Sequence, residues 1–329
     1  MSSSATVYGD ISPRTAAFAV AKLLKRGVPF LIIEKFGQVF VMPDKSTKVA
    51  KFRRYNALAL ANVPLVEGVT PAGKKVSVTD VTATLDQYGD YTSFTDVIQD
   101  THEDPFLSAV TEVLGEQAAQ TMEKVRYDII KAGTNVFYTN GSSRTDVNTP
   151  ITLTTLRKAT RALKRQNAVH ITSVVSSTPD FRTEPVEAAF IALVHPDVEN
   201  DIRNLTGYVA TKQYGTVTPW QNEIGAVEDV RFLRSTIFQA FPDAGAATST
   251  MISTTGTVSD VYPILVVAKD AYAVVPLKGA DSMTIMVVNP KASSGDPLGQ
   301  RGTAGWKVMH TAVILNDAWM VRIEAAATN

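Results

Sequence analysis

The sequence predicts an α+β fold in which one long helix accompanies many short strands. Apolar residues three and four positions apart indicate a helix over residues 103–131, and short β-prone segments precede and follow it. The chain has 329 residues, of which 45% are hydrophobic, so it is long enough for two or three lobes with cores of their own. Because no clean linker separates the lobes, we expect them to be interleaved.

Charge and cysteine content exclude several classes of function. The 32 basic residues equal the 32 acidic ones, whereas a dedicated nucleic-acid binder carries a basic excess. The chain has 0 Cys, which excludes disulfides, thiolate nucleophiles and zinc sites built on sulfur. The N-terminus lacks a signal-peptide pattern, and no apolar run reaches the ~18 residues of a membrane span. We therefore expect a protein that is made and folded in a cytoplasm. The 19% of charged residues is low, which fits an interface-rich surface or simply an uncharged one.

The first third of the chain predicts a helix and then strands. Residues 1–13 are small and polar and predict a flexible arm, and 15–26 form a short amphipathic helix before Gly27 and Pro29. The β-prone segments that follow are 30–33, 38–41, 49–55 and 75–85. Between the last two lies a polar loop, 67–75. We interpret this region as a long hairpin-like extension with a charged tip. An ordinary antiparallel sheet inside a domain explains the same pattern, and the residues alone favour that alternative.

The helix over 103–131 is the strongest single element. At ~1.5 Å per residue it is roughly 43 Å long, which suits a strut. Its apolar stripe consists of Phe106, Val110, Leu114, Ala118, Met122, Val125 and Ile129, widened by Leu107, Val113, Ala119 and Ile130. A second helix is expected at 152–166, with Thr154 as its N-cap. We expect its basic residues to form a solvated face or to meet acidic neighbours, with a nucleic-acid face as the alternative; they are Arg157, Lys158, Arg161, Lys164 and Arg165.

After residue 187 the pattern becomes α/β and then ends in strands. We expect a buried strand at 188–194, a short helix from the His195-Pro196 corner to residue 204, a strand at 230–233, an exposed loop at 244–260 and a strand at 283–289. Two further pairs of strands are each expected to form a hairpin: 262–268 with 271–277, and 308–315 with 318–324. The second hairpin turns at Asn316-Asp317, because both residue types tolerate the positive φ of a tight turn. It is expected to pack on the long helix.

No set of residues predicts catalysis or a bound cofactor. Residues 68–74 match the first part of a phosphate-binding loop, but Lys75 follows where Ser or Thr is needed, and no helix begins there. His195 with Asp197 fits a strand-to-helix corner better than a metal site. The acidic residues of 96–104 favour the start of the long helix, with a divalent-cation site as the alternative. We therefore expect no catalytic, cofactor-binding or metal-binding residues, and no enzyme.

Several segments, taken in order, carry a resemblance to a known family. They are 35–38, 65–71, 87–90, 114–119, 195–198, 225–232 and the C-terminal stretch from Gly295 through Trp306 to Glu324. In sequence, these segments resemble the major capsid proteins of tailed double-stranded DNA phages, and the N4-like group in particular. The resemblance implies the Hong Kong 97-type capsid fold. Its parts would be an N-terminal arm and short helix (1–35), an E-loop β extension (36–95), a P-domain with the spine helix 103–131 (96–185), an A-domain (186–290) and a C-terminal hairpin returning to the P-domain (291–329).

The resemblance also implies a function. The chain would be a major capsid protein, a structural subunit that self-assembles as pentamers and hexamers into an icosahedral shell around the phage double-stranded DNA genome. Its partners would be hundreds of copies of itself, a portal protein at one vertex and DNA bound non-specifically, without a membrane. Because the chain has no room for a long N-terminal scaffolding segment, we expect a separate scaffolding protein. Assembly would take place in the cytoplasm of the host bacterium, and the product would be the virion capsid.

The residues expected at subunit interfaces lie on the extension: Glu67, Lys74, Lys75, Arg53 and Arg54. Two alternatives remain at this point. One is an encapsulin-like nanocompartment shell, which shares the fold but encloses an enzyme cargo. The other is a soluble α/β enzyme whose site the motifs do not reveal.

Overall fold

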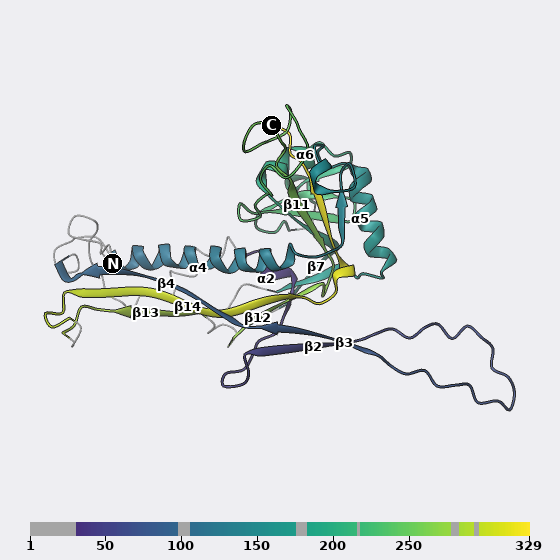
Figure 1. Cartoon of the computed structure of the whole chain (residues 1–329), viewed down its shortest axis with the longest axis horizontal. Helices are drawn as coiled ribbons and strands as arrows, with labels where there is room; N and C mark the ends of the chain where they lie inside the picture. The colour runs from purple at the N-terminus through teal and green to yellow at the C-terminus, as the bar shows by residue number, and fades with distance from the viewer. Residues whose placement is uncertain (1–30, 98–105, 176–182, 216–217, 278–282, 293–295) are drawn as a thin grey trace.

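The computed structural model describes residues 31–97, 106–175, 183–215, 218–277, 283–292 and 296–329 (Figure 1). The predicted arm at 1–13, the helix at 15–26 and most of the acidic group at 96–104 lie outside these ranges. The described helices are α2 (Ile33–Phe36), α4 (Phe106–Ile130), α5 (Leu153–Arg165) and α6 (Glu199–Arg203), with 3₁₀ turns η3 (Arg144–Asp146), η4 (Pro196–Val198), η5 (Thr211–Gln213) and η7 (Asp317–Trp319). Over these ranges, no helix combines the length and the apolar character needed to cross a membrane.

Two sheets form the body of the molecule. The larger, eight-stranded sheet has the order β5 (Val136–Tyr138), β15 (Met320–Ala325), β11 (Tyr262–Val267), β7 (Thr183–Val194), β10 (Val230–Arg234), β9 (Glu223–Val227) and β8 (Tyr208–Ala210), with β6 (Ile171–Val175) paired to β7. The five-stranded sheet has the order β1 (Gln38–Val39), β12 (Tyr272–Pro276), β14 (Arg301–Ile314) and β13 (Met283–Val288), with β4 (Asp86–Thr95) also paired to β14. Strands β11, β12 and β10 are almost wholly buried, as their apolar sequences require.

The long helix is confirmed, and it lies along the five-stranded sheet (Figure 1). One of its faces packs on β14, and the indole Nε1 of Trp306 donates a hydrogen bond to Gln117 Oε1 at 3.1 Å. Val113, which the sequence placed on the apolar stripe, is 56% exposed, so that assignment is wrong. Polar Glu123 and Arg126 lie on the buried side of the helix instead, which a search for apolar residues cannot find.

Both predicted hairpins are wrong. Strand β14 pairs with β12, β13 and β4, whereas β15 pairs with β11 and β5 in the other sheet. Between β14 and β15, Asn316 has an extended backbone with φ −144°, and the chain continues into the 3₁₀ turn η7. In the same way, β11 and β12, which precede and follow Asp270, belong to different sheets. The physical reason is that these strands are largely buried, and neighbours from distant parts of the chain cover more of them than the adjacent segment can.

The two connections between the sheets lie against each other. The backbone N–H groups of Leu315 and Asn316 donate to the carbonyl of Ala271 at 2.9 and 3.0 Å. Each connection therefore supports the other where the chain changes sheets. The C-terminal stretch does return to the long helix, through β14 along the helix and through Met320 and Arg322 of β15 at its C-terminal end. The expected interleaving of the lobes is confirmed by these crossings.

Several shorter elements also differ from expectation. The predicted strand at 30–33 is wrong where it is described, because Ile33 begins α2 and both Ile33 and Phe36 are buried at helical spacing. The N-cap of α5 is Thr152, whose hydroxyl accepts the N–H of Thr155 at 3.3 Å, and not Thr154. The corner with proline at the first turn is confirmed by η4 and α6.

Candidate interface surface

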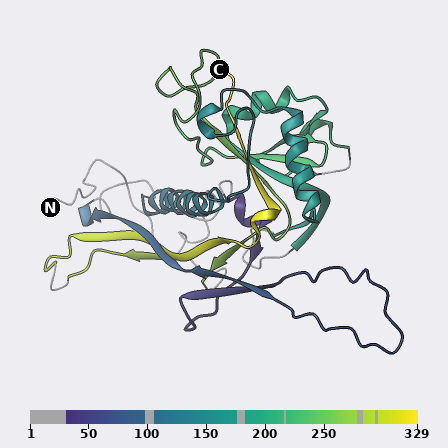
Figure 2. The ribbon, with the colours of Figure 1, turned by 45° about the vertical axis from the view of Figure 1, so that its right-hand side comes forward.

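The predicted extension is present as a two-stranded ribbon that projects from the body (Figure 2). Strands β2 (Val49–Tyr55) and β3 (Val78–Thr84) pair in register from Val49 opposite Thr84 to Tyr55 opposite Val78. Within the described ranges they pair only with each other, so the alternative of an ordinary sheet inside a domain is wrong. A small core holds the ribbon's root to β12, and it contains Met42, Ala50, Ala83, Leu85 and Val275.

Beyond the paired strands, residues 56–77 continue outward without regular structure. Gly68, with φ +76°, allows the chain to reverse, and the N–H of Val69 donates to the carbonyl of Val66 at 3.1 Å. Large apolar side chains are exposed along this loop, and Leu60 at 87%, Val63 at 79% and Leu65 at 78% are the extreme cases. A projecting apolar surface of this kind marks an interaction site.

The five predicted interface residues do not form one cluster. Arg53 is occupied within the ribbon, because its Nε and Nη2 donate to the two carboxylate oxygens of Asp80 at 2.8 and 3.1 Å. Lys51 adds a contact to Asp80 at 2.7 Å, and the hydrogen bonds from Arg53 and Lys51 hold the pKa of Asp80 far below its usual range. Arg53 therefore fastens β2 to β3.

The lysines near the tip have different surroundings. Lys74 Nζ donates to the carbonyls of Ala59 and Leu60 at 2.7 and 3.3 Å, so it joins the two arms of the loop. Glu67 and Lys75 are exposed, as is Lys74. No helix begins in this part of the loop, so the glycine-rich segment lacks the helix N-terminus that a phosphate site needs.

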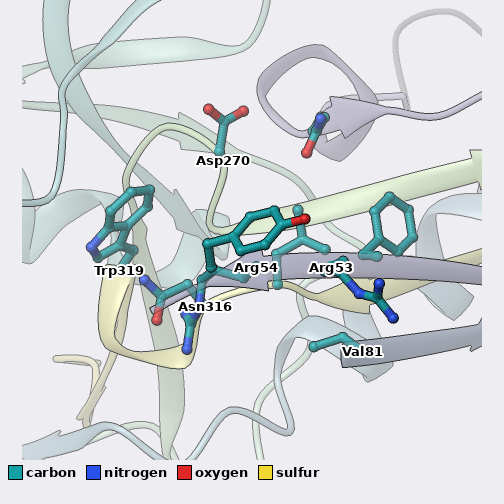
Figure 3. A pocket seen from close by; sticks show the side chains of 10 residues that line it. Arg53, Arg54, Val81, Asp270, Asn316 and Trp319 are labelled. Atoms are coloured by element: carbon teal, nitrogen blue, oxygen red, sulfur yellow. The ribbon is translucent and has the colours of Figure 1, made fainter. Parts of the chain in front are cut away.

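Arg54 lies near the end of β2 that leads into the loop, beside a cavity of about 390 Å³ (Figure 3). The cavity lies where the ribbon passes the two connections between the sheets. In Figure 3, Trp319 and Asn316 lie on one side of it, Arg53 and Val81 on the other, and Asp270 above. The predicted charged residues are thus spread from strand β2 to the loop near the tip.

Sequence reasoning missed the apolar residues of the loop. They are Leu58, Leu60, Val63, Leu65, Val66, Val69 and Val76. The signal was present, because five of them precede the polar tip in a stretch that was already predicted to project. Glu67, Lys74 and Lys75 were predicted as interface residues because of their charge, and the apolar residues beside them were not considered.

Two other predicted groups have structural roles. His195 Nδ1 accepts the N–H of Asp197 at 3.3 Å, and Tyr262 donates its hydroxyl to the Asp197 carboxylate at 2.6 Å, as expected for a strand-to-helix corner. On α5, Arg157 donates to Glu228 at 2.8 Å and Lys164 bonds to Asp229, so part of the basic face meets acidic neighbours as predicted. Among the described residues, no group of three or more His, Asp or Glu is arranged to hold a metal ion.

Comparison with known proteins identifies what this architecture is similar to. The sequence profile of the family described as "Phage capsid protein" matches residues 78–323. The capsid of cyanophage Pam1 superposes with a TM-score of 0.65 at 11% identity, covering 100% of this chain and 98% of that one. The capsid of Ralstonia phage GP4 gives 0.63 at 11%, covering 100% and 99%, and that of cyanophage P-SCSP1u gives 0.59 at 14%, covering 90% and 88%. These likenesses confirm the Hong Kong 97-type fold. A search of curated proteins finds no match.

Proposed function

Because this chain belongs to the phage capsid protein family and is a structural subunit of a phage shell, we propose that its β2–β3 extension is the arm through which one subunit binds the next. The observation that carries the proposal is the exposed apolar surface of residues 56–77. Each Leu or Val side chain that becomes fully buried contributes about 1.5–3 kcal/mol. Several such residues on a projecting loop favour a neighbouring subunit as the surface that covers them.

The resemblance to N4-like capsid proteins supports a finer assignment. Subunits assemble as pentamers and hexamers into an icosahedral shell around double-stranded DNA, in the cytoplasm of the host bacterium. In this assignment the ribbon belongs to the E-loop region (36–95), α4 is the spine helix of the P-domain (96–185), and residues 186–290 form the A-domain around the symmetry axes. The N-terminal arm (1–35), the C-terminal return (291–329), a portal protein and a separate scaffolding protein complete the proposal.

Closed symmetry gives the contacts their strength. An interface that repeats around a ring or a shell adds many weak contacts, and obligate interfaces reach areas beyond ~2,000 Å². An arm that reaches over a neighbour enlarges the contact area without enlarging the subunit core. All of the charged residues are exposed; Arg53 and Lys74 also shape the arm through their own hydrogen bonds, so Glu67 and Lys75 are the ones we expect to contact a neighbour.

Electron microscopy of the expressed chain tests this proposal. The wild-type chain, alone or with its co-expressed scaffolding protein, is expected to form closed shells, tubes or polyheads in negative stain. The double variant Leu60→Ser/Leu65→Ser is expected to remain as small particles while its thermal unfolding stays unchanged, because both side chains are exposed in the subunit.

The variant Val169→Ser is the matched control, since it replaces an exposed apolar residue outside the extension. It should assemble like the wild type. A double variant that assembles normally would show that the loop is not the binding arm. A wild-type chain that stays monomeric at high concentration even with the scaffolding protein would contradict self-assembly itself.

A further inference from the structure

Residues 31–37 lie where the main parts of the subunit meet. The short helix α2 contacts α4, and the hydroxyl of the buried Tyr272 on β12 donates to the carbonyl of Ile33 at 2.6 Å. The ring of Phe36 packs edge-on against Trp220, with 5.0 Å between ring centres. Strand β1 follows directly and leads to the extension. The position of this segment therefore affects the root of the extension.

A buried carboxylate holds the start of this segment to the long helix. Glu123 of α4 is 0% exposed, and its Oε1 accepts the backbone N–H groups of Ile32 and Ile33 at 3.0 and 2.9 Å. Its other oxygen, Oε2, has no hydrogen-bond partner in the described part of the chain. The nearby Arg126 directs its Nη1 to Glu34 at 2.7 Å, and its Nε is unpaired among the described residues. A carboxylate in this position is incompletely compensated.

Burial raises the pKa of Glu123 to about 7, against the opposing effects of the Arg126 charge and the two N–H groups. The other titratable groups around it come from α2, α4, β12 and β14. Burial lowers the pKa of Lys35 on α2 and raises that of Tyr272, and it lowers the pKa of His310 on β14 to about 3. His310 and Tyr272 are thus neutral from pH 6 to 8, whereas Glu123 changes its charge.

We propose that Glu123 makes the attachment of residues 31–37 to α4 depend on pH: the segment is held when the carboxyl group is protonated and is held more weakly when it is ionised. Both states keep an acceptor for Ile32 and Ile33. The ionised carboxylate, however, must remain dehydrated with one oxygen unpaired, and detachment of the segment returns it to water.

The direction and the size of the pH effect on attachment follow from the difference in the pKa of Glu123 between the attached and detached states. In the attached state the carboxyl titrates near pH 7, and in the detached, hydrated state it titrates near its usual ~4.3. The attached state therefore binds the proton more tightly, and attachment weakens as pH rises. Between pH 6 and pH 8 the attachment constant is expected to fall about tenfold. This inference concerns the subunit alone and does not depend on assembly.

Hydrogen exchange of the Ile32 and Ile33 amides tests the proposal, because both donate directly to Glu123. Protection factors, corrected for the intrinsic pH dependence of exchange, are measured on the full-length unassembled chain at pH 6, 7 and 8. We expect about tenfold lower protection at pH 8 than at pH 6 in the wild type. Amides of Ile264 and Val266, in the buried strand β11, serve as the internal reference and should not change.

Two variants distinguish a pH-dependent role of Glu123 from a purely structural role of its carboxyl group. Glu123→Gln keeps a neutral acceptor and should show the same protection at pH 6 and pH 8. Glu116→Gln, two turns earlier on α4 and only partly buried, should keep the wild-type pH dependence. Equal wild-type protection at both pH values would overturn the proposal without any variant, as would a pH dependence that persists in Glu123→Gln.

Discussion

At the scale of single residues, buried carboxylates connect parts of the chain that are distant in sequence. Glu324 on β15 accepts Arg144 at 2.7 and 2.8 Å and Arg322 at 2.8 Å, and its side chain is 0% exposed. Arg322 also donates to the carbonyls of Gly133, at 3.0 Å, and Lys131, which follow the C-terminal end of α4. One ionic group thus ties the end of the long helix to the eight-stranded sheet.

The variant Glu324→Gln should be strongly destabilised, because removal of one partner leaves two arginines around an uncharged side chain. We expect a loss of about 3 kcal/mol in the free energy of unfolding, measured by urea denaturation of the unassembled subunit. The control is Glu228→Gln, which breaks the exposed pair with Arg157 and should change stability by less than about 1 kcal/mol. Equal effects of the two variants would show that burial does not govern the strength of these pairs.

At the scale of elements, α4 has one buried and one exposed side, and the adjacent residues Val113 and Leu114 lie on different sides. Leu114 belongs to the core formed with Trp306 and Val308, whereas Val113 is exposed. The spacing of apolar residues predicted the helix and most of its buried face correctly. It misplaced Val113 because hydrophobicity alone does not show which side of a wide stripe meets the sheet.

Leu114→Ala is expected to lower the free energy of unfolding by about 2–4 kcal/mol, since it leaves a cavity between the helix and the sheet. Val113→Ala should change it by less than about 0.5 kcal/mol. Thermal or urea unfolding of the two variants, compared with the wild type, measures the difference. Comparable losses at both positions would mean that the helix is rotated relative to the arrangement described above.

At the scale of the whole molecule, we expect the extension to serve the association of subunits and to contribute little to the stability of its own subunit. Its loop contributes little to the body's core, because its apolar side chains are exposed and its root alone is packed. Its two lysines near the tip are both exposed but are not equivalent, because Lys74 also donates to the carbonyls of Ala59 and Leu60.

Reversal of both charges, Lys74→Glu/Lys75→Glu, should therefore impair assembly and shift the Tm of the free subunit by no more than about 2 °C. Light scattering and negative-stain microscopy follow assembly, and differential scanning fluorimetry follows the Tm. The variant Lys74→Arg/Lys75→Arg keeps the charge and should assemble. A fall in Tm of about 5 °C or more after reversal would show that contacts of the two lysines within their own subunit stabilise its fold.

The sequence by itself determined the local elements of this protein. The helix at α4, the buried strands β10, β11 and β12, the buried end of β7, the partly exposed strand β13, the ribbon strand β2 and the proline corner at His195 all follow from periodicity and from residue type within a short window. The order of short matching segments also indicated the family, which the sequence profile confirmed. N4-like membership and the interface roles of Glu67, Lys74, Lys75, Arg53 and Arg54 stay predictions.

Only the tertiary structure decided which strands pair. Residues 262–277 and 308–324 each look like a hairpin, yet each crosses between sheets, because a largely buried strand is stabilised by whichever neighbours cover it. The buried Glu123 and Glu324 escaped notice for the same reason, since a charged side chain on a helix or strand is buried only when a distant partner compensates it. Pairing and burial depend on long-range contacts, and no local window of sequence contains them.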